Sequence, residues 1–175
     1  MFRLALPALA ALAFLAQPAL AGDACKGIKI KEDKFGTGKS ADVVIQGLSQ
    51  LRMLGLYMQA DSGAVTFTVK VKEGGALNGL VAAGTEVMFS FDGGEVVTLA
   101  TANDAALQSY VAGDVVLTNV PYTFQLTAEQ LDKFATVDLV ALRVPVISTG
   151  TTYDWDANGG VVKKLRSSAT CLQSL

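Results

Sequence analysis

Apolar and polar residues alternate most clearly over residues 65–72 and 86–91. In the first segment, valine and phenylalanine occupy every second position between threonines and lysines. In the second segment, Val87, Phe89 and Phe91 are separated by Met88 and Ser90. Successive side chains of a strand point to opposite faces, so both segments predict strands with one face in the core. One buried and one hydrated face is typical of an antiparallel sheet.

The second of these strands leads into the strongest turn signal of the chain. Asp92 is followed by Gly93 and Gly94, which can adopt positive φ without a Cβ clash. Aspartate tolerates turn geometry through its own side chain. The residues that follow are rich in β-branched side chains, which favour strands. Residues 85–101 therefore predict a β-hairpin, with Asp92 as a turn residue in preference to a catalytic carboxylate.

Shorter or less regular patterns predict the remaining strands, at residues 26–32, 42–45, 48–58, 115–124 and 138–147. The first is expected to be half-buried. In the last, Leu139 and Ala141 are expected on one face, with Arg143 left open, and Val140, Leu142 and Val144 on the other. The segment 48–58 partly fits both periods, but its glycine weakens a helix. Pro121 cannot donate to a ladder, so its strand is expected to be an edge or to bulge there. Residues 101–113 are expected to connect strands, with a helical turn near 104–108.

Two helices are predicted towards the end of the chain. Thr127 and Gln130 form a capping-box pattern before a short helix at about 128–135. Apolar residues at helical spacing predict a C-terminal helix at about 160–173, which carries Cys171. The predicted fold is mainly β: an antiparallel β-sandwich or partly open barrel with these two helices.

Residues 1–21 have the organisation of a secretory signal peptide. Arg3 gives a positive start, residues 4–15 are apolar, and Ala19 and Ala21 are small residues at the positions that determine cleavage. About 16 apolar residues are short for a membrane span, which needs about 20. Cleavage after Ala21 would leave residues 22–175 as a single β-rich domain without a membrane span. We therefore expect an exported protein, periplasmic or extracellular.

The two cysteines, Cys25 and Cys171, lie near the two ends of this expected mature chain. An even number of cysteines in an exported protein favours a disulfide. The bond would close a loop longer than about 100 residues, for which the chain-entropy model gives about 4.7 kcal/mol. A catalytic thiol is the alternative, but the chain has no histidine to activate it. Lipidation of Cys25 is disfavoured, because the preceding residues, including Asp23, do not form a lipobox.

Charge and composition disfavour two classes of ligand. The chain is 51% hydrophobic and 17% charged, as expected for a folded domain. Its formal charge is −2, and loss of Arg3 from the 14 basic residues leaves 13 against 16 acidic residues, a charge near −3. No basic patch is present, so nucleic-acid binding is disfavoured. Residues 36–40 resemble the end of a phosphate loop but lack its spacing, which disfavours nucleotide binding.

The most suggestive ligand motif is the run of residues 154–159. Asp154, Asp156 and Asn158, followed by glycine, match the opening of a calcium loop. The twelfth position, which should close the site with a carboxylate, is Leu165. We therefore favour a polar turn whose side chains cap the last helix. Calcium at these three residues is the weaker hypothesis, and no other cofactor is expected.

Tyr153 and Trp155 alternate with these carboxylates and are the aromatic residues most suited to contact a ligand. Core packing, however, explains aromatic residues more often. Without histidine no Ser–His or Cys–His pair can form, and no G-x-S-x-G motif occurs. Paired carboxylates, as in a glycosidase, stay open as a hypothesis because sequence does not show which acids meet in space.

Five short motifs occur along the mature chain, at residues 28–35, 89–93, 126–131, 141–144 and 171–172. Together they resemble a loose group of uncharacterised exported bacterial proteins with small β-rich domains. The resemblance implies a structural or binding role and carries over no functional residue. We predict an exported, non-catalytic binding or structural protein of the bacterial envelope or exterior, whose partner is an unknown protein or polysaccharide. A carboxylate-dependent hydrolase and a calcium-binding module are the alternatives.

Overall fold

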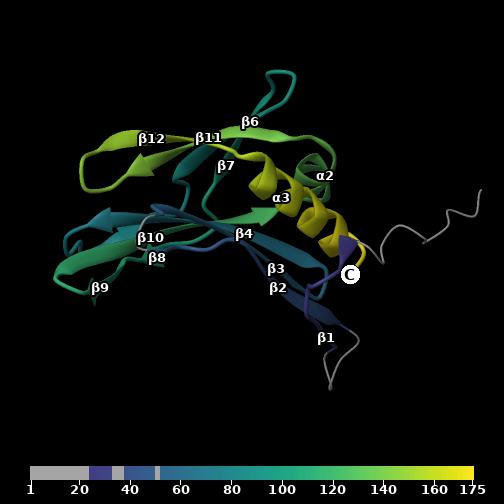
Figure 1. Cartoon of the computed structure of the whole chain (residues 1–175), viewed down its shortest axis with the longest axis horizontal. Coiled ribbons are helices and arrows are strands. Elements are labelled where there is room, and N and C mark those ends of the chain that lie inside the picture. Colours follow the sequence, from purple (N-terminus) through teal and green to yellow (C-terminus); the bar gives the residue numbers. More distant parts are fainter. Residues whose placement is uncertain (1–23, 33–37, 50–51) are drawn as a thin grey trace, which may run out of the picture.

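The computed structural model describes residues 24–32, 38–49 and 52–175, and over these residues the chain is mainly β (Figure 1). Two antiparallel sheets have the strand orders β1-β2-β3-β4-β10-β9 and β12-β11-β6-β7. The strands of the six-stranded sheet are β1 (Ile30–Glu32), β2 (Lys39–Gln46), β3 (Leu54–Asp61), β4 (Ala64–Gly74), β10 (Val115–Leu126) and β9 (Gln108–Ala112). Those of the four-stranded sheet are β12 (Thr151–Asp156), β11 (Leu139–Val146), β6 (Glu86–Phe91) and β7 (Val96–Ala100). Two short strands, β5 (Leu80–Val81) and β8 (Ala105–Ala106), pair with each other.

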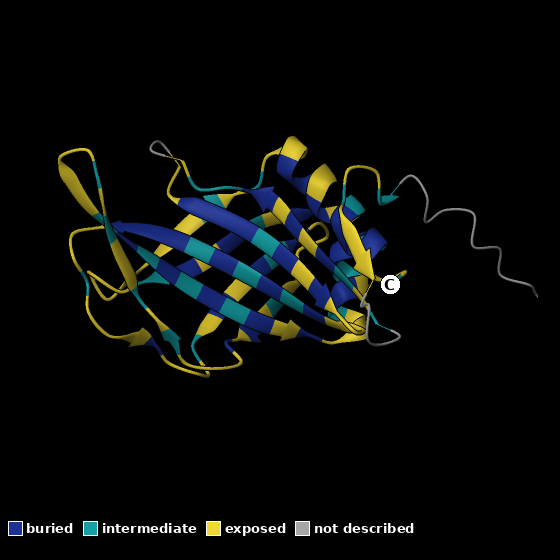
Figure 2. Ribbon diagram, turned by 90° about the horizontal axis from the view of Figure 1, so that it is seen from below, coloured by how far each residue is buried: buried dark blue, intermediate teal, exposed yellow. Residues whose placement is uncertain are grey.

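The six-stranded sheet curls beneath the four-stranded sheet, and both described helices lie at one end of the molecule (Figure 1). Helix α2 (Ala128–Thr136) follows β10, and α3 (Gly159–Leu172) follows β12. The helices contact each other, and α3 also packs against β2. Figure 2 shows buried residues alternating with intermediate or exposed residues along the strands of the curled sheet. The predicted mainly β, antiparallel fold with a short and a C-terminal helix is confirmed.

Phenylalanines from both sheets and from α2 form the centre of the core. Phe134 of α2 lies edge-on to Phe67, Phe89 and Phe91, with ring centroids 5.1, 5.5 and 5.3 Å away. Phe124 of β10 completes the cluster, and each of these side chains is at most 1% exposed. Edge-to-face aromatic pairs add about 0.5–1.5 kcal/mol beyond the area that they bury. The cluster therefore fixes α2 against both sheets.

The hairpin formed by β6 and β7 is confirmed. Phe89 lies opposite Val97 in the ladder. Gly93 and Gly94 adopt φ values of +85° and +83° in the turn, a region that glycine enters without strain. The Gly93 N–H donates to Asp92 Oδ1 at 3.0 Å. Asp92 is therefore a turn residue, as predicted.

Both helices begin within one residue of the predicted positions. The Gln130 N–H donates to Thr127 Oγ1 at 3.2 Å, and the Thr127 N–H donates to Gln130 Oε1 at 2.9 Å, so the capping box is complete. Helix α3 begins at Gly159, and Asn158 Oδ1 accepts from the Val161 N–H at 3.0 Å. These side chains satisfy N–H groups that have no partner within a helix.

Cys25 and Cys171 form the predicted disulfide. The bond joins the segment before β1 to the last turn of α3, across 146 residues of sequence. Cys171 is fully buried, with 0% of its surface exposed. The C-terminal end of α3 is thereby attached covalently to the beginning of the described chain, and the unfolded chain loses conformational freedom.

Some local expectations differ from the structure. Residues 101–113 contain β8 and β9 in place of a helical turn, because Gln108–Ala112 pairs with β10 across a turn at Gly113. The strand expected at 48–58 begins at Leu54, and residues 50–51 lie outside the described chain. The first strand is exposed rather than half-buried, since it is a three-residue edge strand whose Ile30 is 40% exposed.

The edge expected at Pro121 is confirmed locally. Strand β10 pairs with β4 from residue 117 to 126, but with β9 only as far as Asn119. The Ala102 N–H donates to the Thr123 carbonyl at 2.9 Å, so the odd-numbered residues of β10 direct their backbone groups away from β4. Pro121 therefore lacks a donor on the side that β9 no longer covers.

The signal peptide predicted at residues 1–21 and the first two residues of the segment 36–40 lie outside the described residues. Within the part of the chain that the structure describes, neither the length nor the apolar character of any helix is sufficient to cross a membrane.

Candidate functional site

Strand β11 contains a β-bulge near its start. Leu139 pairs with Phe91 and Ala141 with Ser90, so Val140 is an extra residue without a partner on β6. Leu139 is 2% exposed, whereas Val140 is 48% exposed. The predicted division of faces holds from Ala141 onward, where Leu142 and Val144 are buried and Arg143 is exposed. It is wrong for Leu139 and Val140, because the extra residue at the bulge exchanges their faces. Bulges redirect side chains in this way and are frequent beside functional sites.

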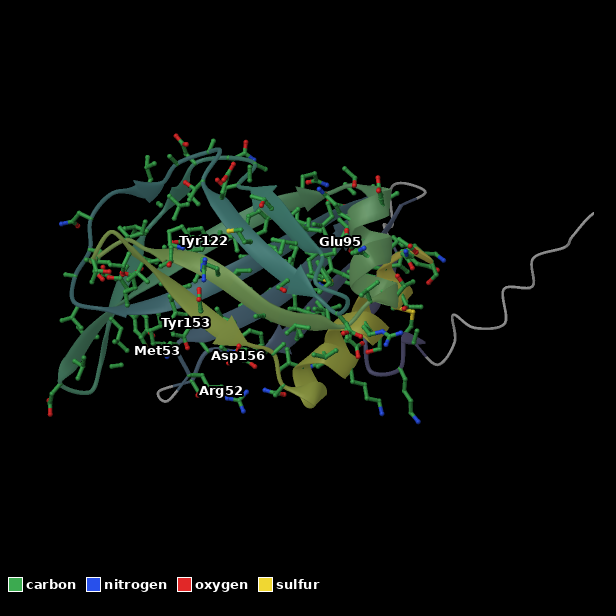
Figure 3. All side chains as sticks on the ribbon, turned by 90° about the horizontal axis from the view of Figure 1, so that it is seen from above. Arg52, Met53, Glu95, Tyr122, Tyr153 and Asp156 are labelled. Carbon is green, nitrogen blue, oxygen red and sulfur yellow. A yellow bond between two sulfur atoms is a disulfide. The ribbon has the colours of Figure 1, made fainter. Side chains whose placement is uncertain are left out.

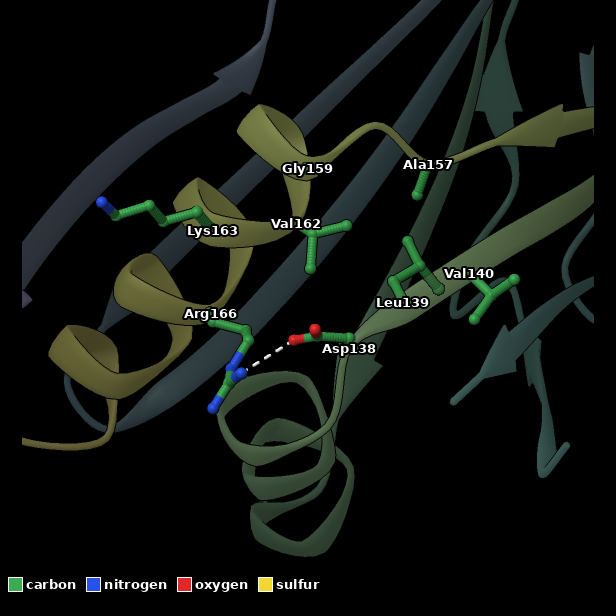
Figure 4. A pocket seen from close by; sticks show the side chains of 8 residues that line it. All are labelled: Asp138, Leu139, Val140, Ala157, Gly159, Val162, Lys163 and Arg166. Carbon is green, nitrogen blue, oxygen red and sulfur yellow. Dashed lines mark hydrogen bonds and ion pairs between the residues drawn. The ribbon is translucent and has the colours of Figure 1, made fainter. Parts of the chain in front are cut away.

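A first hollow beside this bulge, the helix hollow, lies between the start of β11 and the first turns of α3 (Figure 4). Its volume is about 450 Å³. The lining residues are Asp138, Leu139, Val140, Ala157, Gly159, Val162, Lys163 and Arg166. Apolar side chains and two cationic side chains thus share this hollow.

Arg166 is already used to hold the structure together. Its Nη1 donates to Asp138 Oδ1 at 2.8 Å (Figure 4), and its Nε donates to the Ala135 carbonyl at 3.3 Å. These bonds tie α3 to the last turn of α2 and to the residue that precedes β11. Lys163 forms no ion pair with a described residue. The helix hollow therefore offers one ammonium group beside apolar side chains, which does not define a ligand.

A second hollow, the sheet hollow, lies on the outer face of the four-stranded sheet and has a volume of about 240 Å³. The cross-strand register places its lining residues side by side: Met88, Ser90, Val96, Ala141, Leu142, Arg143, Asp154 and Asp156. Ser90 and Ala141 are small, whereas Met88 and Val96 are 40% and 50% exposed. Apolar surface with a few convergent polar groups is the usual composition of a ligand site.

Arg143 and Asp154 form a bidentate ion pair at this hollow. Arg143 Nε and Nη2 donate to the two Asp154 oxygens, each at 2.6 Å. The hydrogen bond from Arg143, helped by its charge, holds the pKa of Asp154 below its ordinary value, and the same contact raises the pKa of Arg143. Asp154 therefore stays ionised with both oxygens engaged. Asp156 makes no ion pair or side-chain hydrogen bond with a described residue.

The motif at residues 154–159 does not form the polar turn that was predicted. Asp154 and Asp156 belong to β12, because their segment pairs with β11 along the whole strand. Residues 157–158 alone connect β12 to α3, and Asn158 is the N-cap that the favoured interpretation required. Across the described ranges, no group of three or more His, Cys, Asp or Glu side chains could hold a metal ion.

Strand alternation separates the aromatic candidates from the acidic ones. Tyr153 and Trp155 lie opposite buried residues of β11, so both aromatic side chains belong to the inner face. Trp155 is half-buried and packs against the core, whereas Tyr153 is 38% exposed. Asp154 and Asp156 lie on the outer face, beside the sheet hollow. The predicted site residues are therefore neighbours on one strand, but they face opposite sides.

Strand β12 is an edge strand with an open outer backbone. The Ala157 N–H donates to the Val140 carbonyl at 2.8 Å, so odd-numbered residues here direct their backbone groups towards β11. The N–H and C=O groups of Thr152, Asp154 and Asp156 consequently point away from the sheet. None of them bonds to another backbone group of the described chain. Figure 3 shows Tyr153 and Asp156 along this strand, where every residue except Trp155 is exposed.

Sequence analysis missed a buried polar cluster near the other end of β11. Glu73 of β4 is 3% exposed, and its two oxygens accept from the Ile147 and Ser148 N–H groups at 2.9 and 2.8 Å. The Tyr122 hydroxyl donates to the Pro145 carbonyl at 2.7 Å. Burial, together with the nearby charge of Glu73, raises the pKa of Tyr122. The alternation of residues 65–72, extended by one position, would have placed Glu73 on the inner face.

Comparisons with known proteins found no matching family model, no matching curated protein and no matching solved structure. The resemblance to exported β-rich bacterial proteins stays a prediction based on short motifs.

Proposed function

We propose that this chain is an exported, non-catalytic binding protein that presents the β11–β12 side of its four-stranded sheet to a partner. The organisation of residues 1–21 supports export through a signal peptide. The disulfide between Cys25 and Cys171 is compatible with an oxidising compartment. The partner is then a protein or polysaccharide of the bacterial envelope or exterior.

The observation that carries this proposal is that the sheet hollow and the open edge of β12 adjoin each other. Met88 and Val96 offer exposed apolar contact, and Asp156 offers a carboxylate without a described ionic partner. All three residues stand on paired strands, which hold a binding site more rigidly than loops do. A partner could therefore contact the face and the edge of the same sheet together.

A carboxylate-dependent hydrolase is the second candidate, because Asp154 and Asp156 line the same hollow. A glycosidase needs a general acid with a raised pKa beside a second carboxylate. Both Asp154 oxygens accept from Arg143, so neither is free to act as the nucleophile or base that such an enzyme requires. The binding proposal is better supported on this ground.

A calcium site at Asp154, Asp156 and Asn158 has less support. Both Asp154 oxygens accept from Arg143, and the Asn158 side chain caps α3. We expect the melting temperature to be the same with Ca²⁺ and with EDTA. A melting temperature that rises with Ca²⁺ at micromolar concentration would establish the calcium module instead.

A binding titration with matched charge reversals tests the proposed function. Residues 22–175 are immobilised and exposed to fractionated envelope extract and to a panel of polysaccharides, as wild type, Asp156→Lys and Glu86→Lys. Glu86 is an exposed residue of β6 that serves as the control. We expect saturable binding that Asp156→Lys weakens by about tenfold or more, and Glu86→Lys leaves unchanged. Equal binding by all three proteins would show that the partner binds at another surface of the molecule. Hydrolysis of a glycoside by the wild type that is lost in Asp156→Asn would establish the hydrolase.

A further inference from the structure

We propose that the open edge of β12 accepts an extended segment of a partner protein as a fifth strand of the four-stranded sheet. In this segment, basic residues alternate with apolar residues. The inference rests on the proposed binding function and names the class of partner, a polypeptide with a strand-forming alternating sequence.

The backbone of β12 supplies the first half of the recognition. Thr152, Asp154 and Asp156 each direct one N–H donor and one C=O acceptor outwards, and no described backbone group bonds to them. An added strand satisfies such groups with its own main chain, whatever its side chains are. Strand addition to an exposed sheet edge gains affinity from these bonds and specificity from alternate side chains.

The outer side chains of β12 select a positive charge. Residues directly opposite each other on neighbouring strands have Cβ atoms about 4.5–5.5 Å apart, so a partner residue opposite Asp156 is within ion-pair reach. Arg143 neutralises Asp154, whereas Asp156 has no described ionic partner, which leaves the sheet hollow with one net negative charge. A lysine or arginine opposite Asp156 provides the missing cation.

The inner side chains of β12 select an apolar residue. Tyr153 is 38% exposed and Trp155 is half-buried, although both lie on the face that covers the core. In an added strand, the residues that alternate with the basic ones would lie beside the Tyr153 and Trp155 rings. Aromatic residues form favourable cross-strand pairs with β-branched neighbours, so valine, isoleucine or threonine fits these positions.

A second copy of this chain is a poorer occupant of the edge. Two antiparallel β12 strands centred on Asp154 would place two Asp154 carboxylates opposite each other, and like charges in that position are destabilising. Acidic side chains on an edge are a known device against self-pairing. The free edges of β7 and β9 carry no charged residue, so they offer no charge complementarity to a basic segment.

Synthetic peptides test the inference directly on residues 22–175. One peptide alternates lysine with valine, and a second alternates glutamate with valine. Two further versions of the lysine peptide carry N-methyl groups on the lysine amides alone or on the valine amides alone. Trp155 is the single tryptophan of the chain and lies on β12, so its emission reports binding at this edge.

We expect the lysine–valine peptide to bind saturably and to shift the Trp155 emission. Only one alternate set of amides can face β12, so one methylated peptide should bind about tenfold more weakly and the other within about twofold of the parent. Asp156→Lys should weaken the lysine peptide and strengthen the glutamate peptide, whereas Glu86→Lys should change neither. Equal binding by the two methylated peptides would overturn strand addition.

Two proline variants distinguish the edges of the molecule. Thr152→Pro removes an outward N–H of β12 without removing a bond to β11. Val111→Pro makes the matching change on β9. The backbone groups of Tyr110 face Leu117 of β10, so those of Val111 point away from the sheet. Thr152→Pro should weaken the lysine peptide several-fold and Val111→Pro should not, with circular dichroism confirming that both variants fold. The reverse result would move the docking edge to β9 and overturn the inference.

The two proposals fail in different ways. A polysaccharide whose binding depends on Asp156, combined with no binding of the lysine peptide, would leave the proposed function standing and refute the protein partner. Absence of any ligand sensitive to Asp156→Lys, in the extract, among the polysaccharides and among the peptides, would refute both.

Discussion

The β6–β7 and β11–β12 hairpins belong to the same sheet, but they differ in the burial of their side chains and in the partners of their aspartates. The inward residues Phe89 and Phe91 of β6 are at most 1% exposed, whereas every residue of β12 except Trp155 is exposed. Both hairpins contain aspartates. Asp92 accepts from its neighbour Gly93, but Asp156 has no described side-chain partner. The difference follows from sheet order, because β6 is internal and β12 lies at an edge.

The two turns are also held in different ways. The β6–β7 turn is closed by the local bond from the Gly94 N–H to the Phe91 carbonyl and by one from the Asp92 N–H to the Asp138 carbonyl. The β11–β12 turn has a local bond from the Gly150 N–H to the Val146 carbonyl, and Glu73 of the other sheet accepts from Ile147 and Ser148. The second turn therefore depends in addition on a buried side chain of the other sheet.

Phe89→Ala should have the largest effect on stability. The Phe89 ring is 0% exposed and lies 5.7, 5.9 and 5.5 Å from the rings of Phe67, Phe124 and Phe134. Removal of a buried aromatic side chain costs about 3–5 kcal/mol of unfolding free energy. Urea unfolding measures the loss. Tyr153→Ala, on β12, is the matched control and should cost less than about 1 kcal/mol; equal losses would contradict the contrast between the hairpins.

Glu73→Gln should come next, with a loss of about 2–3 kcal/mol. Hydrogen bonds to a charged group contribute about 1.5–3 kcal/mol each, and an amide cannot accept both N–H groups in the same way. Hydrogen exchange at Ile147 and Ser148 should accelerate together with the loss of stability. Glu86→Gln, at an exposed position of β6, is the control and should change neither measurement. Unchanged exchange in Glu73→Gln would show that the turn does not depend on this carboxylate.

Sequence patterns predicted the features whose interactions lie close together in the chain. In the β6–β7 turn the Asp92 carboxylate accepts from the neighbouring Gly93 N–H, and the capping box joins Thr127 to Gln130. Alternation likewise placed Phe89 and Phe91 in the core. The β-bulge at Val140 was not predictable, because it is defined by pairing with β6 and leaves no local signature. The extra residue displaced Leu139 and Val140 from their expected faces, whereas the residues from Ala141 onward alternate as expected.

The candidate site was located in the correct stretch but with the wrong local structure. The D-x-D-x-N-G pattern favoured a turn, yet pairing with β11 extended a strand through Asp156. The ion pair between Arg143 and Asp154 depends on the register of two strands, which local sequence does not encode. The open edge of β12 depends on the order of strands in the sheet, so it could be recognised in the structure alone.

Gly93→Ala should have a smaller effect, confined to the β6–β7 turn. Gly93 has φ of +85° and open space around the position of a Cβ atom. The cost is therefore backbone strain, which is about 1–2 kcal/mol for a non-glycine residue in this region. Gly74→Ala is the matched control, because Gly74 also has open space but no positive φ. Urea unfolding should show a loss for Gly93→Ala and none for Gly74→Ala; equal losses would remove strain as the cause.

The smallest effect concerns the exposed pair of Arg143 and Asp154 on the β12 side of the sheet. Because Arg143 lowers the pKa of Asp154, the contribution of the pair is present above the unfolded carboxyl value of about 3.9. It is lost as the pH falls through the lower folded value. At neutral pH, Arg143→Gln should leave the melting temperature nearly unchanged, since exposed ion pairs contribute little.

The same variant should nevertheless change the charge of the proposed docking edge. Without Arg143, the pKa of Asp154 should rise towards its ordinary value. The pH dependence that this ion pair gives to the unfolding free energy should then disappear. Carboxyl carbon resonances in an NMR titration measure the shift. Arg166→Gln removes a different ion pair, to Asp138, and should leave the Asp154 titration unchanged. Because two uncompensated aspartates would then face outwards at neutral pH, the lysine–valine peptide should bind Arg143→Gln more tightly than wild type, and weaker binding would show that Arg143 itself contacts the partner.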